Sequence, residues 1–253
     1  MTISKYKELS TDQLFRYSRH IQLKSMDIDG QEKLYNAKVL IIGLGGLGCA
    51  ASQYLAASGV GALTLVDDDI VDKTNLQRQV LHGEPDVGSA KCISARQALE
   101  YINSEITLHT IQERLSGDAL ARVIAEHDLV LDCCDNITTR NAINQYAFAH
   151  KVPLVSGAAI RMEGQVAVFD MQDNHACYQC LSHSFKDQTL TCAEAGVLSP
   201  LVGMVGSIQA IEAIKLIAQV GVPLSGRLML IDAFNMDTQI YTLPKIPHCR
   251  VCR

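Results

Sequence analysis

The sequence predicts an α/β fold in which a mostly parallel, Rossmann-like sheet has helices on both faces and is extended by antiparallel strands. Short apolar segments alternate with helical segments between residues 38 and 156, an order typical of parallel sheets. A glycine-rich loop joins the first apolar segment to the first of these helices. Beyond residue 157 the alternation gives way to short strands separated by polar loops, which favours antiparallel pairing at one end of the sheet.

The composition suits a single domain with a large core. The 253 residues are 48% apolar and 19% charged, which leaves ample material for burial and no sign of disorder. The net charge of −5 and the absence of a run of Lys or Arg argue against nucleic acid as a main partner. Nine cysteines and a polar N-terminus without a secretory signal favour reduced thiols or metal ligands in a cytoplasmic protein.

The segment over residues 198–222 is long and apolar. It contains polar and charged side chains at several positions, namely Gln209, Glu212, Lys215 and Gln219. We therefore expect a buried helix rather than a membrane span, and no membrane partner.

The N-terminal segment predicts a helix over residues 10–24. Ser10 can cap its first turn, and Gln13 stands at the capping-box position three residues later. Arg16 and Arg19 project from neighbouring positions. Their spacing alone favours a solvated basic face.

The elements of the parallel sheet follow in alternation. Strands are predicted at residues 38–42, 63–66, 107–112, 129–132 and 152–156, and helices at residues 47–58, 89–102, 116–126 and 138–149. Additional strands are predicted at residues 165–169, 227–231 and 241–243.

The loop GLGGLG, residues 43–48, has the spacing of a phosphate-binding loop. Backbone N–H groups and a helix N-terminus meet at such a loop, and Gly46 lets the backbone approach a ligand closely. Asp67 ends the second strand, where an acid can accept hydrogen bonds from ribose hydroxyls. These features alone also fit a dinucleotide oxidoreductase, and a glycine turn that serves only packing is a further alternative.

The residues after Asp67 favour a triphosphate over a dinucleotide. Asn75 and Arg78 follow in the next segment, and Lys91 opens the next predicted helix. Arg can bind phosphate through two parallel hydrogen bonds, and Lys acts as a point charge. A dinucleotide site needs no such cluster, because the glycine loop and the helix dipole hold most of its pyrophosphate.

A second candidate ligand follows the fourth strand in the sequence CCDN. Asp135 is a candidate magnesium ligand, since residues at the carboxyl ends of strands line the ligand crevice and Mg²⁺ prefers oxygen. Alternatively, Asp135 caps the next helix. Cys133 and Cys134 are most simply buried small apolar residues.

Two CxxC pairs, Cys177 with Cys180 and Cys249 with Cys252, predict a structural zinc site with four thiolate ligands. A redox pair and substitution by the flanking histidines are the alternatives. Cys192 stands apart and is either a nucleophile or a buried structural residue.

Together these segments resemble the family of ThiF and MoeB proteins, bacterial relatives of ubiquitin-activating enzymes. The resemblance covers essentially the whole chain. It is carried by RYSRHIQL (residues 16–23), GLGGLG (43–48), DDDIVDKTNLQRQ (67–79), Lys91, DCCDN (132–136) and the two cysteine pairs.

The resemblance implies that ATP binds with its phosphates against the backbone around Gly46 and its ribose at Asp67. The other nucleotide-binding residues that it implies are Asp69, Thr74, Asn75, Leu76, Gln77, Arg78, Lys91, Asp135 and Asn136. It further implies that Asp135 binds magnesium and that the catalytic residues are Arg19, Arg78, Lys91 and Asp135. Arg19 would reach the ATP site of the neighbouring subunit, so that a homodimer is the functional form.

The implied activity is adenylation of the C-terminal Gly-Gly carboxylate of a small ubiquitin-like sulfur-carrier protein, with release of pyrophosphate. Residues 38–156 would form the nucleotide-binding half of one domain, and residues 157–253 would bind the carrier and zinc. The stretch SGAAIRMEGQ, residues 156–165, is more similar to the MoeB branch, which serves molybdenum cofactor biosynthesis, than to the ThiF branch of thiamine biosynthesis. A thiamine sulfur carrier, an NAD-dependent oxidoreductase and a zinc-stabilised scaffold without activity are the alternatives.

Overall fold

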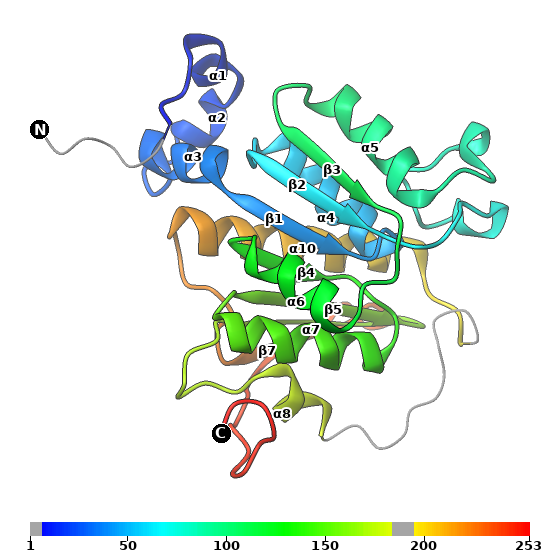
Figure 1. Ribbon diagram of the computed structural model, residues 1–253, viewed down its shortest axis with the longest axis vertical. Helices are drawn as coiled ribbons and strands as arrows, with labels where there is room; N and C mark the ends of the chain where they lie inside the picture. Colours follow the sequence, from blue (N-terminus) through cyan, green and yellow to red (C-terminus); the bar gives the residue numbers. More distant parts are fainter. Residues whose placement is uncertain (1–6, 184–194) are drawn as a thin grey trace, which may run out of the picture.

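The computed structural model describes residues 7–183 and 195–253. One eight-stranded sheet with the order β3-β2-β1-β4-β5-β6-β7-β8 runs through the molecule (Figure 1). The strands β3, β2, β1, β4 and β5 are parallel, and β6, β7 and β8 continue the sheet in antiparallel fashion. The predicted fold class is confirmed, including the antiparallel extension at one end.

Three helices precede the sheet: α1 (Thr11–Arg16), α2 (Ser18–Ile21) and α3 (Asp27–Asn36). The capping box of Ser10 and Gln13 is present as predicted. The prediction of a single helix over residues 10–24 is wrong, because α1 ends before Tyr17 and α2 begins after it. The Tyr17 ring packs beside Gly59, and its hydroxyl accepts a hydrogen bond from Asn103 Nδ2 at 2.9 Å. This buried anchor outweighs the helical propensity of the segment.

The parallel half contains every strand and helix that the sequence predicts there, with ends shifted by at most a few residues. Its elements are β1 (Lys38–Ile42), α4 (Gly46–Ala57), β2 (Ala62–Val66), the 3₁₀ helices η1 (Lys73–Asn75) and η2 (Glu84–Asp86), α5 (Lys91–Ile102), β3 (Thr107–Ile111), α6 (Gly117–Ala125), β4 (Leu129–Asp132), α7 (Ile137–His150) and β5 (Leu154–Ile160).

The antiparallel half adds β6 (Glu163–Phe169), α8 (Tyr178–Ser182), α10 (Ser199–Ala218), β7 (Arg227–Asp232) and β8 (Asp237–Thr242). The strand predicted at residues 241–243 begins earlier, as β8, and forms the edge of the sheet. Every residue of β8 is exposed, so its sequence lacks the apolar alternation that marks a half-buried strand.

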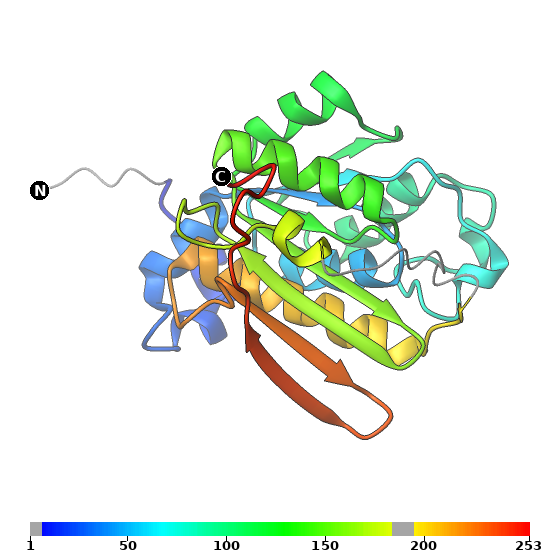
Figure 2. The ribbon, with the colours of Figure 1, turned by 90° about the horizontal axis from the view of Figure 1, so that it is seen from below.

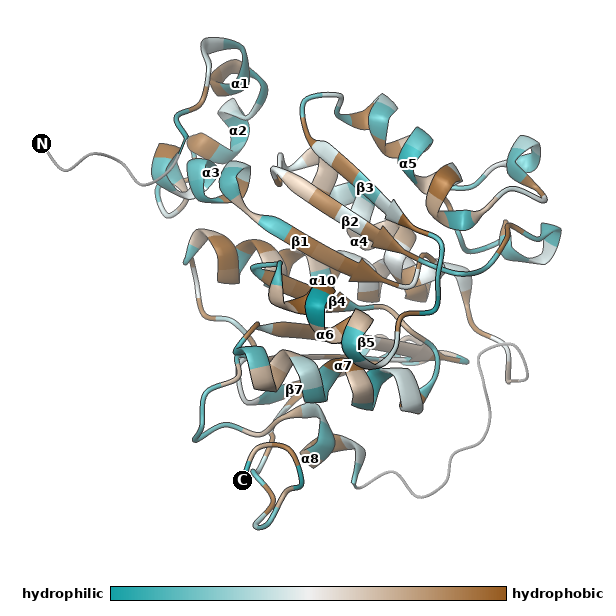
Figure 3. Cartoon of the chain, viewed as in Figure 1, coloured by the Kyte–Doolittle hydropathy of each residue, from teal (hydrophilic) through white to brown (hydrophobic). Residues whose placement is uncertain are grey.

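Two hydrophobic cores lie on opposite faces of the sheet. Figure 2 shows α6 and α7 on one face and α10 on the other. The larger core joins α3, α4, α5 and α10 to the sheet, and the smaller joins α6, α7 and α8 to it. The central strands β1 and β4 are almost entirely apolar (Figure 3), because both of their faces are covered.

Helix α10 has the length and apolar composition of a membrane span, and half of that window is buried. It packs along α4, where the two backbones approach closely: a Cβ on Gly206 would lie 2.3 Å from the Leu47 carbonyl oxygen. Gln209 and Glu212 are buried within the fold. The prediction of a buried helix is therefore confirmed.

Candidate active site

A cavity of about 1170 Å³ opens at the carboxyl ends of the parallel strands. It lies where the strand order reverses between β1 and β4, the usual position of a ligand crevice in such sheets. Eight of the predicted nucleotide-binding residues line it: Gly46, Asp67, Asp69, Asn75, Arg78, Lys91, Asp135 and Asn136. Segments far apart in the sequence thus converge on one cavity.

The glycine loop has the tight geometry that its sequence predicts. Gly43 has φ +95°, a left-handed conformation that favours glycine. A Cβ on Gly48 would lie 1.9 Å from the Gly43 carbonyl oxygen. At Gly46 the closest approach is to α10, because an added Cβ would lie 2.5 Å from Val202 Cγ2. Gly46 therefore allows helix packing as well as access to the cavity.

Asp67 joins the second strand to the glycine loop. Its Oδ2 accepts a hydrogen bond from the Leu44 N–H at 2.6 Å, and its Oδ1 accepts one from the Asp69 N–H at 2.9 Å. Burial raises the pKa of Asp67, while these two backbone donors act to lower it. A carboxylate has about four acceptor positions, so the two oxygens can accept further bonds from a ligand.

Lys91 and Asp69 form an ion pair at the cavity wall, with 2.8 Å between Lys91 Nζ and Asp69 Oδ2. Lys91 is buried, whereas the Asp69 side chain is 61% exposed. The pair holds the lysine ammonium beside the cavity and compensates its charge.

The segment around η1 supplies Asn75 and Arg78. Asn75 Oδ1 accepts a hydrogen bond from the Asp72 N–H, and Arg78 donates from NH1 to the Thr74 carbonyl at 3.1 Å. The predicted residues Thr74, Leu76 and Gln77 do not line the cavity. The Thr74 hydroxyl instead donates to Asp72 Oδ1 at 2.6 Å, which stabilises η1 and thereby the start of the Arg78 segment.

Asp135 and Asn136 have different roles at the end of β4. Asn136 is the N-cap of α7, since its Oδ1 accepts a hydrogen bond from the Thr139 N–H at 2.9 Å. Asp135 is therefore not the cap. Within residues 7–183 and 195–253 its exposed carboxylate has no hydrogen-bond or ion-pair partner. It stands free at the cavity wall.

Sequence reasoning missed two buried polar residues of this wall. Gln79 is 3% exposed, and its Oε1 has no hydrogen-bond partner in the described part of the chain. Arg140 lies behind the Asp135 loop, where it donates to the Cys134 carbonyl and faces Asp132 Oδ2 at 3.6 Å. Burial acts to lower the pKa of Arg140, but the Asp132 carboxylate together with the side chains of Tyr178, Cys134 and Cys133 raises that pKa above its usual value.

Two further residues of the cavity wall, Glu113 and Arg114, could have been predicted from the topology of the sheet. They follow β3, whose carboxyl end meets the same crevice, and they line the cavity. Arg114 Nε lies 3.2 Å from Asp68 Oδ2. The burial of Gln79 and Arg140 cannot be predicted in this way from the sequence. The one hint is that Gln79 directly follows Arg78, a predicted site residue.

Arg19 lies outside this cavity. It is exposed on α2 and donates to Gln22 Oε1 at 3.3 Å. Helix α2 lies at the opposite end of β1 from the glycine loop (Figure 1). Arg19 therefore does not reach the cavity of its own chain.

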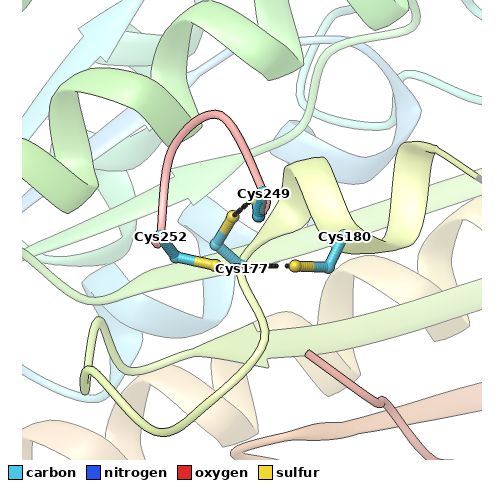
Figure 4. Close-up of side chains that lie close together, drawn as sticks. All are labelled: Cys177, Cys180, Cys249 and Cys252. Atoms are coloured by element: carbon cyan, nitrogen blue, oxygen red, sulfur yellow. Dashed lines mark hydrogen bonds between the residues drawn. The ribbon is translucent and has the colours of Figure 1, made fainter. Parts of the chain in front are cut away.

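Cys177, Cys180, Cys249 and Cys252 form one buried cluster, with the sulfur atoms within 4.8 Å of one another. Their side chains point toward a common centre from the start of α8 and from the C-terminal loop (Figure 4). The Sγ atoms of Cys177 and Cys249 are 3.7 Å apart, and those of Cys180 and Cys252 are 3.5 Å apart. Tetrahedral zinc with bonds of about 2.3 Å needs sulfur atoms about 3.8 Å apart, so the donor set fits zinc.

The other cysteines are placed as the sequence predicts, apart from Cys192, which lies outside the described residues. Cys49, Cys92 and Cys133 are buried, and Cys134 is nearly so. Burial raises the pKa of both Cys133 and Cys134. Their thiols therefore stay protonated and act as small apolar groups.

Comparison with known proteins identifies the family. The model of the ThiF family matches residues 17–251. This chain belongs to the ThiF family.

Curated members of the family are similar over nearly the full length. The molybdopterin-synthase adenylyltransferase of Escherichia coli (strain K12) is 54% identical over 245 residues, which cover 97% of this chain and 98% of that protein. The sulfur carrier protein ThiS adenylyltransferase of the same organism is 42% identical over 237 residues, covering 94% of each chain. This ThiF-family chain is thus more similar to the former, as the stretch over residues 156–165 predicts.

Solved structures share the fold. The crystal structure of E. coli MccB with ATP aligns with a TM-score of 0.80 at 26% identity, covering 94% of this chain and 73% of that one. PaaA aligns with a TM-score of 0.81 at 26% identity, covering 96% of this chain and 77% of that one.

Proposed function

We propose that this protein adenylates the C-terminal Gly-Gly carboxylate of a small ubiquitin-like sulfur-carrier protein, the small subunit of molybdopterin synthase, at the expense of ATP. The observation that carries the proposal is the cavity in which the glycine loop, the cations Arg78 and Lys91 and the free carboxylate of Asp135 converge. Full-length relatives that are named molybdopterin-synthase adenylyltransferases support the choice of reaction and carrier.

The cavity suits ATP in three of its parts. The first turn of α4 offers backbone N–H groups to phosphate at Gly46. Arg78 and Lys91 supply positive charge beside it. Apolar side chains of Ile42 and Leu120 line another wall, which suits the face of a purine ring.

The carrier tail has a matching path along β5 and β6. Small residues, Ala158, Ala159 and Gly164, line the cavity there. A Cβ on Gly164 would lie 2.7 Å from Val205 Cγ2, so the wall is tightly packed behind this path. A tail of two glycines has no side chains and suits a passage of this kind.

The reaction that follows is an in-line displacement. An oxygen of the carrier carboxylate attacks the α-phosphorus of ATP, the bond to the bridging oxygen breaks, and pyrophosphate leaves with the electron pair. The carboxylate is already ionised at neutral pH, so no protein base is required. Arg78 and Lys91 hold the phosphates and stabilise the charge that develops on them.

Magnesium is expected with ATP. Asp135 and the clustered carboxylates of Asp67, Asp68 and Asp69, which also line the cavity, offer the hard oxygen ligands that Mg²⁺ prefers. The ion would neutralise phosphate charge and favour departure of pyrophosphate. Asp135 is the residue assigned to it, because its carboxylate is free among the described residues.

Zinc is assigned to the cysteine cluster, and its removal gives a testable prediction. We expect one zinc per chain, measured by elemental analysis, and its loss in C252S with a fall of about 5–10 °C in the unfolding midpoint. H175A and H248A are the matched controls and should keep their zinc, because the four cysteines form the cluster without a histidine and His175 is paired with Asp170 at 2.9 Å. Zinc that persists in C252S, or is lost from either histidine variant, would refute the four-thiolate site.

A homodimer is part of the proposal. Arg19 does not reach the cavity of its own chain, and apolar side chains are exposed in the N-terminal segment of α1 to α3 and on α10: Phe15, Leu23, Ile28, Met204 and Ile211. Apolar patches on a surface mark protein contacts. In a symmetric dimer each subunit can supply Arg19 to the other.

Mixing two inactive variants tests that arrangement. R19A and D135N are each expected to be inactive, but mixed dimers contain one cavity with both residues intact. With random exchange about half of the dimers are mixed and one of their two sites works, so activity recovers to about a quarter of the native rate. The two variants are mixed, diluted so that dimers dissociate, and concentrated again so that they re-form. The rate of carrier adenylation is then measured. No recovery, with exchange of subunits demonstrated, would place Arg19 outside the partner's site.

The direct product test is intact-mass analysis of the carrier. A carrier ending in Gly-Gly should gain the mass of one adenylyl group, which is AMP less one water, when incubated with this protein, ATP and Mg²⁺. A carrier lacking the last glycine is the control and should not be modified. Modification of a thiamine-type carrier at the higher rate would instead favour the second candidate, which the 42% identity to the ThiS adenylyltransferase supports less well.

A further inference from the structure

A buried histidine lies directly beneath the glycine loop. His82 is 6% exposed and follows the Arg78 segment, and its backbone N–H donates to the Gln79 carbonyl at 3.0 Å. Its Nε2 lies 3.3 Å from the Leu44 carbonyl oxygen, and its Nδ1 lies 2.8 Å from Ser94 Oγ. Three parts of the candidate triphosphate site therefore meet at one imidazole: the glycine loop, the Arg78 segment and the helix that begins with Lys91.

The partners of the ring favour one tautomer. The Leu44 carbonyl can only accept a hydrogen bond and lies closer to Nε2 than Cys49 Sγ does, 3.3 Å against 3.7 Å, so we assign the proton to Nε2, which donates it to Leu44. Nδ1 then accepts from the Ser94 hydroxyl. Burial lowers the pKa of His82, although the contact with Leu44 acts in the opposite direction. The ring is therefore neutral at neutral pH in this arrangement.

The contact with the Leu44 carbonyl also determines the direction of the next backbone N–H, that of Gly45. The Leu44 C=O and the Gly45 N–H belong to one planar trans peptide, in which the two groups point in opposite directions. Since the carbonyl points down at His82, the Gly45 N–H points away from the ring, and Gly45 lines the cavity. The Leu44 N–H is fixed separately by Asp67 Oδ2 at 2.6 Å.

We propose that His82 is a positioning residue that holds the Leu44–Gly45 peptide so that the Gly45 N–H faces the phosphates of ATP. This inference rests on the proposed adenylation. The thiol of Cys49 also donates to the Leu44 carbonyl, at 3.3 Å, but a thiol is a weak donor and leaves the orientation to the imidazole.

Two substitutions separate the contacts of the ring. In H82Q the side-chain amide can reach the position of Nε2 and donate to Leu44. In H82N the amide reaches only the position of Nδ1, so the Leu44 carbonyl loses its main donor. Steady-state kinetics of ATP–pyrophosphate exchange with the carrier is measured for both variants and for the native protein, along with the unfolding midpoint.

We expect H82N to raise the KM for ATP about tenfold (about 1.4 kcal/mol), while the KM for the carrier stays within about twofold of the native value. H82Q should remain within about threefold for ATP. An unchanged KM for ATP in H82N, or an equal rise in both variants, overturns the proposal, since a purely structural role would not separate the two amides. Absence of exchange in the native protein would refute the adenylation itself instead.

A third variant keeps the test decisive if H82N does not fold. S94A retains the imidazole and removes only the hydroxyl that holds the ring at Nδ1. We expect an increase of about threefold in the KM for ATP, because the ring is then held less firmly against the Leu44 carbonyl. A native KM for ATP in S94A, when H82N is unfolded, would overturn the proposal.

Discussion

Replacing Asp135 with Asn is expected to lower the rate of carrier adenylation by about a thousandfold while the protein stays folded. The change is isosteric and removes a carboxylate that is exposed at the cavity wall and has no partner among the described residues. Little stability should be lost with it, since no hydrogen bond is broken. In the proposed mechanism the loss falls on catalysis, because the variant would bind Mg²⁺ and the leaving pyrophosphate poorly.

The measurement is the single-turnover rate of adenylate formation at several Mg²⁺ concentrations. The matched control is D118N, which removes another exposed carboxylate near the start of a helix, α6, that does not itself line the cavity. It should behave as the native protein. Near-native rates in D135N would show that the metal is held elsewhere, with the Asp67–Asp69 group the next candidate.

Replacing Arg78 with Ala is expected to lower kcat/KM for ATP by about a hundredfold or more. The guanidinium makes one hydrogen bond, to the Thr74 carbonyl at 3.1 Å, which leaves its other donors available to a ligand in the cavity that Arg78 lines. R78K keeps the charge but loses the planar fork that matches phosphate, so it should recover only part of the loss.

Kinetics with ATP as the varied substrate, together with ATP titration of each variant, separates binding from chemistry. R122A is the control, because Arg122 is an exposed cation on α6 that does not line the cavity. An R78A variant with native kcat and a raised KM would mean that Arg78 binds ATP without stabilising the transition state. Full activity in R78K would exclude a need for the bidentate geometry.

Most of the fold could be predicted from the sequence because the parallel strands are buried on both faces. Their short apolar runs, such as residues 38–42 and 129–132, have no competing pattern, and the glycine loop marks the first βαβ unit. The break at Tyr17 has no local signal, since its cause is a hydrogen bond to Asn103, 86 residues away. The exposed edge strand β8 likewise has no apolar face to detect.

The candidate site likewise contains residues that could be predicted from the sequence and residues that could not. Residues at the ends of β1, β2 and β4 could be predicted because topology brings the carboxyl ends of parallel strands together. Burial of polar side chains could not, since it depends on what packs above them. Gln79, Arg140 and His82 are each 6% exposed or less, and each is defined by contacts that no spacing in the sequence reveals.

The most direct test of the central claim is ATP–pyrophosphate exchange by the folded, zinc-loaded protein, with and without carriers that end in Gly-Gly. The proposed adenylation predicts exchange that requires a carrier and is fastest with the small subunit of molybdopterin synthase. No exchange with any such carrier, in protein whose fold and zinc content are verified, would contradict the account and leave a binding protein without this activity.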